Sequence, residues 1–176
     1  MASVRFSEVI IRGISIVLST FILYILQSGP FTSISLAGVV PDLIIILIIA
    51  VAFQRGRTPA MLTGMLGGFL IDCCYNSILG LNALIYLVIG YISGFTHKIY
   101  DEDDHMTPLL MVSISEFLYN IMYYFFFFLL KGKINFGFYL FRIIMPRIVY
   151  TVLICIVLYP VINAANRYLM RFDNGE

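Results

Sequence analysis

Apolar residues follow one another in long blocks along this chain and do not alternate with polar residues. Blocks of about 20 apolar residues, at a rise of 1.5 Å per residue, match the hydrocarbon layer of a membrane. Backbone groups in lipid must be satisfied within each segment, and the blocks lack the alternation of an outer-membrane barrel, so the pattern predicts helices. The predicted transmembrane helices cover residues 9–27, 38–54, 59–74, 79–96, 106–130 and 137–162.

The second of these helices is unusually short. Its uncharged core, residues 43–53, does not reach across a layer of about 30 Å. We therefore expect it either to recruit the preceding residues ISLAGVV or to lie partly shielded inside the bundle.

Composition excludes a soluble protein, because 61% of the residues are hydrophobic and only 12% are charged. The sequence predicts an all-α membrane protein, a bundle of six transmembrane helices that forms one polytopic domain over residues 1–176. The first helix ends in LQSGPF, without a small-residue cleavage site, and further apolar blocks follow it. We expect it to be retained and not removed as a signal peptide.

Basic residues near the helix ends set the orientation of such a bundle. With the amino terminus in the cytoplasm, only Lys131 and Lys133 of the short loops fall outside. The basic residues that then fall inside are Arg5, Arg12, Arg55, Arg57, Lys98, Arg167 and Arg171. The distribution predicts that both termini are cytoplasmic.

Small and polar residues recur every three or four positions in several predicted helices, which places them on one face of each helix. In the third helix Gly64 and Gly68 form a GxxxG pair, which permits close approach of a neighbouring helix. The stripes contain Arg12, Ser15 and Ser19; Ala60, Gly64, Gly68 and Asp72; Asn82, Tyr86, Gly90 and Gly94; and Ser113, Glu116 and Asn120. These stripes predict a polar seam inside the bundle. For the glycines and serines, helix packing alone would also explain the pattern.

Ionisable residues inside the spans are costly, by about 3 kcal/mol each on insertion scales, and each needs a partner. Counted along the helices, Glu116 and Arg147 lie roughly 15–16 Å into the membrane, so we predict that they form an ion pair. The same count places Asp72 and Arg142 in the outer half and Asp42 at or near the outer edge, and together they are predicted to form a second cluster. Glu8 stands one turn from Arg12, and Pro146 is expected to kink the last helix.

Asp42 follows Pro41 directly, and together they predict a helix start. Proline is tolerated in the first turn, and a carboxylate there is stabilised by the positive end of the helix dipole. This position does not exclude a second role for Asp42, as a partner of Arg142 or of a basic residue on another protein.

No pattern in the chain indicates catalysis. The spans contain no histidine, and the stretch GYISG has the wrong spacing for a GxSxG nucleophile. Cys73, Cys74 and Cys155 lack metal-site spacing, and we interpret the acidic residues 101–104 between His97 and His105 as a solvated loop. We expect no enzyme activity, no cofactor, no metal and no nucleic-acid partner.

Three stretches, PDLIIILIIAVAFQRGR, GMLGGFLIDCC and LGLNALIYLVIGYISG, occur in an order that resembles the bacterial rod shape-determining protein MreD family. The resemblance covers roughly residues 39–95. The chain departs from the family between Asp72 and Gly80, where it has Tyr75 and Asn76 in place of small residues. The residues that we expect to form a partner-binding or structural polar seam are Pro41, Asp42, Gly64, Gly68, Asp72, Gly80, Asn82, Tyr86, Glu116, Arg142 and Arg147.

The resemblance implies a non-enzymatic scaffold of the bacterial inner membrane that takes part in cell-wall elongation. Its expected partners are MreC most directly, MreB, RodA and the RodA transpeptidase in the wider complex, and the lipid bilayer.

The family fold is also similar to the substrate-binding component of energy-coupling-factor transporters. The alternative function is therefore the uptake of a vitamin or another small molecule. Its pocket would be lined by Asp42, Asp72, Asn82, Tyr86 and Arg142. Copurification of a single-span partner would favour the scaffold, and saturable binding of a vitamin-sized ligand would favour the transporter component.

Overall fold

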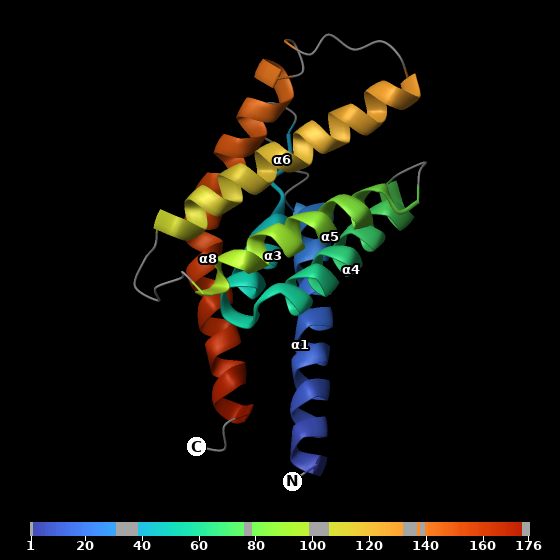
Figure 1. Cartoon of the computed structure of the whole chain (residues 1–176). Helices are drawn as coiled ribbons and strands as arrows, with labels where there is room; N and C mark the ends of the chain where they lie inside the picture. The colour runs from blue at the N-terminus through green and yellow to red at the C-terminus, as the bar shows by residue number, and fades with distance from the viewer. Residues whose placement is uncertain are drawn as a thin grey trace.

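The computed structural model describes the backbone of residues 2–30, 39–75, 79–98, 106–131, 137 and 140–173, and the regular elements in these ranges are all helices. The predicted all-α fold is confirmed. Figure 1 shows the α-helices α1 (Ala2–Ser28), α3 (Leu43–Arg55), α4 (Arg57–Tyr75), α5 (Leu81–Ser93), α6 (Met106–Lys131) and α8 (Met145–Asp173). A 3₁₀ segment, η1 (Gly94–Lys98), continues α5, and a π-helical turn, η2 (Leu140–Ile144), leads into α8.

The short helix α3 lies at the centre of the molecule. Every side chain from Leu43 to Phe53 is at most 2% exposed, and α3 contacts α1, α4, α5, α6 and α8. A helix that is covered on all sides needs apolar residues all round, which explains why this stretch has no polar face. Of the two expectations for this segment, shielding inside the bundle is confirmed.

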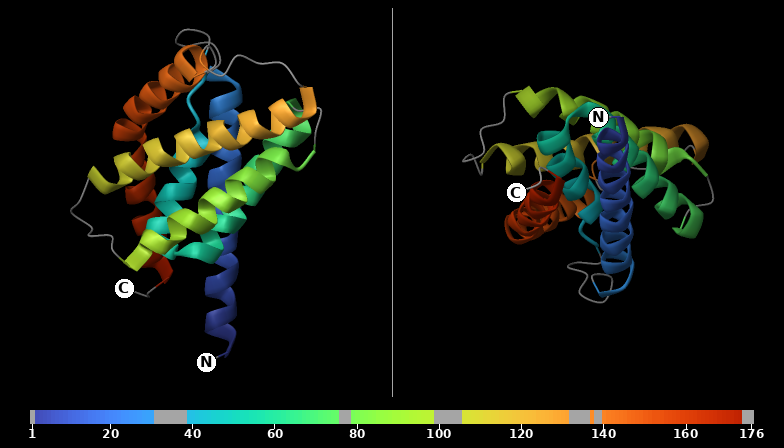
Figure 2. Two further views of the ribbon diagram at one scale, coloured as in Figure 1. Left: turned by 45° about the horizontal axis from the view of Figure 1, so that its top comes forward. Right: turned by 90° about the horizontal axis from the view of Figure 1, so that it is seen from below.

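Helices α4 and α5 lie side by side (Figure 2), and they pack against each other through glycines. A Cβ atom on Gly64 would collide with the carbonyl oxygen of Tyr86, and a Cβ on Gly68 would lie 2.5 Å from the Cα of Ala83. Gly90 of α5 is in the same close contact with the backbone of α4. The predicted small-residue stripe of α4 therefore does face another helix, and a larger residue would force the two backbones apart.

The amino end of α1 and the carboxyl end of α8 lie at the same end of the molecule in both Figure 1 and the left view of Figure 2. Within the described residues, the stretches Met106–Phe126 and Leu140–Ala164 are long and apolar enough to cross a membrane. Shorter apolar helical stretches are Gly13–Ser28, Leu43–Arg55 and Leu81–Thr96. Large apolar side chains are exposed on the outside of the bundle, for example Leu18 at 60% and Val157 at 69%, and lipid would accept them without penalty.

A π-helical turn, η2, directly precedes α8, and the kink predicted at Pro146 stays a prediction. Pro146 is the second residue of α8 and follows η2 without a break, so the π-helical turn lies where proline has no backbone N–H to donate. The structure does not describe the side chains of Glu8 and Arg12, so their predicted pairing stays a prediction. The side chains from His97 to His105 also lie outside the described part of the chain.

Candidate functional site

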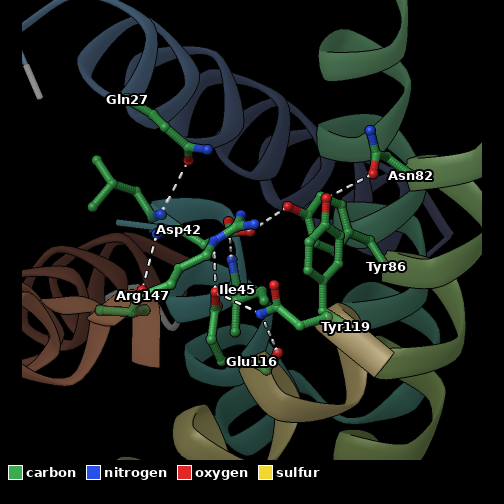
Figure 3. Close-up of polar contacts among 11 residues, drawn as sticks. Gln27, Asp42, Ile45, Asn82, Tyr86, Glu116, Tyr119 and Arg147 are labelled. Carbon is green, nitrogen blue, oxygen red and sulfur yellow. Dashed lines mark hydrogen bonds and ion pairs between the residues drawn. The ribbon is translucent and has the colours of Figure 1, made fainter. Parts of the chain in front are cut away.

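A fully buried carboxylate, that of Asp42, joins three helices, α3, α5 and α8, at the amino end of α3. As predicted, Asp42 caps the helix, since its Oδ1 accepts a hydrogen bond from the backbone N–H of Ile45 at 3.2 Å. Its Oδ2 accepts a hydrogen bond from the Tyr86 hydroxyl of α5 and lies 3.0 Å from Nη2 of Arg147 on α8. Its backbone N–H donates to Thr151 Oγ1 at 3.2 Å (Figure 3). Asp42 therefore caps the start of α3 and pairs with the charge of Arg147 at the same time.

Glu116 and Arg147 form the predicted ion pair. Arg147 Nε lies 2.8 Å from Glu116 Oε1, and the Glu116 side chain is fully buried. Asn120, one turn along α6, donates from Nδ2 to the Glu116 backbone oxygen at 2.7 Å and lies 3.4 Å from Glu116 Oε1. The guanidinium of Arg147 thus bridges two carboxylates from different helices. We call Asp42, Glu116 and Arg147 the ionic cluster (Figure 3).

The predicted grouping of Asp42 with Arg142 is wrong. The guanidinium that reaches Asp42 is that of Arg147, whereas Arg142 lies on the π-helical turn with an exposed side chain. The prediction measured depth from the start of each span and so placed Asp42 at the outer edge. Because α3 is short and begins inside the bundle, Asp42 lies instead at the level of Glu116.

Asp72, the other carboxylate of that predicted group, holds the beginning of α5. Its two oxygens accept hydrogen bonds from the backbone N–H groups of Gly80 at 3.0 Å, Asn82 at 3.3 Å and Ala83 at 3.1 Å, and from Asn82 Nδ2 at 3.0 Å. Gly80 adopts a left-handed conformation with φ of 96°, which favours glycine. Asp72 therefore satisfies the free N–H groups at the start of α5, although it comes from α4.

Tyr119 is a part of the site that the sequence reasoning missed. Its hydroxyl donates to Asn82 Oδ1 at 2.8 Å, its ring stacks on Tyr86 with centroids 5.0 Å apart, and the Arg147 guanidinium carbon lies 4.8 Å from its ring centroid. Its position three residues after Glu116 places it on the same face of α6. The three-residue spacing from Glu116 could therefore have identified Tyr119 in the sequence.

The backbone N–H of Leu43, at the start of α3, donates to Gln27 Oε1 of α1 at 3.0 Å. This contact ties a further helix to the site (Figure 3). Among the described residues, no group of three or more His, Cys, Asp or Glu side chains could hold a metal ion. The ionic cluster can hold the helices together, because moving them apart would leave buried charges without partners, which is costly.

A protein-family model with the description "rod shape-determining protein MreD" matches residues 7–169. The match extends well beyond residues 39–95 and includes both Glu116 and Arg147. A search of curated proteins finds no match, and a search of solved structures finds none either.

Proposed function

Because the chain belongs to the rod shape-determining protein MreD family, which has a role in rod shape determination, we propose that it is a non-enzymatic membrane scaffold of the cell-wall elongation machinery. In this role it binds MreC and helps to position peptidoglycan synthesis. MreB, RodA and the RodA transpeptidase belong to the wider complex. The chain forms six spans in the bacterial inner membrane, and both of its termini lie in the cytoplasm.

The observation that carries this proposal is the bridge made by Arg147 between Asp42 and Glu116, at 3.0 and 2.8 Å. The bridge links α3, α6 and α8, and the Tyr86 hydroxyl adds α5. Strong polar contacts in an apolar interior give helices one defined arrangement. A frame of this kind suits a protein that holds a partner in a fixed geometry.

The predicted topology has support from the arrangement of the chain ends. The amino end of α1 and the carboxyl end of α8 lie at one end of the molecule (Figure 1). A chain that crosses a membrane an even number of times has both of its ends on the same side. The exposed apolar side chains on α1, α6 and α8 suit contact with lipid or with the membrane helix of a partner.

The transporter alternative has less support. Asp72 and Asn82 are engaged at the start of α5, Asp42 is fully buried, and of the residues predicted for that pocket only Tyr86 lines a described cavity. These contacts favour a structural use of the residues over a use in recognising a vitamin.

The test is affinity purification of the tagged chain from its native membrane in mild detergent, followed by mass spectrometry. We expect MreC to be enriched. The Gly13→Ala variant, where a new Cβ meets nothing within 4 Å, should recover MreC at the wild-type level, whereas Arg147→Ala should lose it together with the folded protein. Recovery of a transporter ATPase pair in place of wall-synthesis proteins would overturn the proposal.

A further inference from the structure

Arg57, the first residue of α4, lies with its guanidinium over two aromatic rings from α5 and η1. The guanidinium carbon is 3.6 Å from the ring centroid of Phe95 and 5.8 Å from that of Tyr91. The two rings meet edge to face, with their centroids 5.1 Å apart. Gly94 permits this approach, because a Cβ atom on Gly94 would collide with the Cα of Arg57. The close packing of the two backbones therefore fixes where this charge lies.

The hydrogen-bond donors of Arg57 are available to a ligand. Stacking on a ring uses the face of a guanidinium and leaves the N–H groups at its edge unused. Arg57 is exposed, and among the residues that the structure describes it has neither a carboxylate partner nor a hydrogen-bond acceptor. A positioned guanidinium with unused donors suits a phosphate, because the two groups form paired, charge-assisted hydrogen bonds.

Arg57 lies near the end of the bundle to which both chain termini belong (Figure 1). The residues just before it contact the two terminal helices. Gln54 Nε2 donates to Asn163 Oδ1 of α8 at 2.5 Å, and Arg55 Nη2 donates to Ser15 Oγ of α1 at 3.2 Å. Arginine and tyrosine side chains are typical of the level at which a membrane helix meets the lipid headgroups. This end of the bundle therefore suits a membrane interface.

The exposed face of α5 continues from Arg57 as a strip of apolar and aromatic side chains. Leu84, Tyr91, Ile92 and Phe95 are 43–50% exposed, and their spacing places them on one face of the helix. From Leu84 to Phe95 the strip is about 16 Å long at a rise of 1.5 Å per residue. This length is close to half of a hydrocarbon layer of about 30 Å, which is the depth of one leaflet. An acyl chain that begins at Arg57 matches the strip in length.

We propose that Arg57 and this strip bind one anionic phospholipid, with the phosphate at the guanidinium and an acyl chain along the exposed face of α5. An anionic headgroup is favoured over a zwitterionic one, because the ammonium group of a zwitterionic lipid offsets the phosphate charge. A phosphate dissolved in water would meet the same donors but would leave the apolar strip unused. The site goes beyond the scaffold role, which does not depend on it.

The chain contains no tryptophan, so one fluorophore can report on this site. Phe95→Trp places it there and keeps an aromatic ring for Arg57. Leu153→Trp, on the exposed side of α8, is the matched control. Each purified variant is reconstituted into phosphatidylcholine vesicles that contain either phosphatidylglycerol or phosphatidylcholine with brominated acyl chains. Bromine quenches tryptophan on contact, so the two series give the relative affinity for the two lipids.

At Phe95→Trp we expect phosphatidylglycerol to bind about fivefold more tightly than phosphatidylcholine, which is the factor that one arginine contributes at an anionic membrane. Adding Arg57→Gln should remove the preference. Arg57→Lys should keep part of it, because lysine retains the charge without the planar fork. Leu153→Trp should show no preference. An equal preference at Leu153→Trp, or an unchanged preference after Arg57→Gln, would overturn the proposal.

The Phe95→Trp variant decides the question by itself if the Arg57 variants do not fold. Equal binding of the two lipids there would mean that another group, such as the acidic residues 101–104, already neutralises Arg57, and it would overturn the proposal. Glycerol phosphate is then added to the water phase of the same vesicles. It should leave the preference unchanged, because it does not use the strip. Loss of the preference would identify a soluble phosphate as the ligand and would overturn the lipid as occupant.

Discussion

Replacing Arg147 by alanine removes the positive charge that two buried carboxylates share. In the wild-type protein Arg147 lies 3.0 Å from Asp42 and 2.8 Å from Glu116, and both acids are fully buried. After the change Asp42 still accepts hydrogen bonds from the backbone of Ile45 and from the Tyr86 hydroxyl. Among the residues that the structure describes, Glu116 then keeps only the 3.4 Å contact with Asn120.

The expected loss follows from these contacts. Removing one partner of a buried ion pair costs about 3–5 kcal/mol, and two carboxylates lose the same partner here, so we expect the upper part of that range. Folding free energies are about 5–15 kcal/mol, so the variant should give a low yield of folded protein. Arg147→Lys should recover part of the loss, because lysine restores the charge but not the two-sided geometry of the guanidinium.

The measurement is the fraction of folded protein during an SDS titration in mixed micelles. Arg142→Ala, which removes an exposed guanidinium, is the matched control and should change the stability by no more than about 1 kcal/mol. Combining Arg147→Ala with Glu116→Gln removes one of the two unpaired charges, so the double variant should be more stable than Arg147→Ala alone. Unfolding of Arg147→Ala at the wild-type SDS concentration would refute the structural role of the ionic cluster.

Three further changes test the surrounding contacts by the same titration. Gly68→Ala places a Cβ 2.5 Å from the backbone of α5 and should cost about 1–3 kcal/mol. Gly13→Ala, where nothing lies within 4 Å, should be neutral or slightly stabilising; equal effects at both glycines would contradict the close packing. Asp72→Ala removes the acceptors at the start of α5 and should cost about 0.5–2 kcal/mol, and no loss would mean that water replaces them. Tyr86→Phe removes the hydroxyl that donates to the ionic cluster and should cost about 1.5–3 kcal/mol. Tyr91→Phe on the exposed side of α5 should change the stability by less than about 0.5 kcal/mol, and similar losses in the two variants would exclude a special role for the buried hydroxyl.

Several features of this protein follow from the sequence alone, because they depend on local pattern. The long apolar blocks determine helices, and the spacing of Gly64 and Gly68 determines which face of α4 another helix approaches. The sequence Pro41–Asp42 determines a helix start with its cap. The pairing of Glu116 with Arg147 was also predictable, because lipid leaves a buried charge few alternatives.

The tertiary structure alone decided which acid joined that pair. Depth counted along the chain assumes that each helix begins at the membrane edge, and α3 begins inside the bundle, so Asp42 reaches Arg147. The role of Asp72 was also hidden, because its partners are backbone N–H groups of the next helix, which have no signature in the sequence. Periodicity reports which face of a helix is polar, whereas the partner that this face meets depends on the tilt and depth of the neighbouring helices.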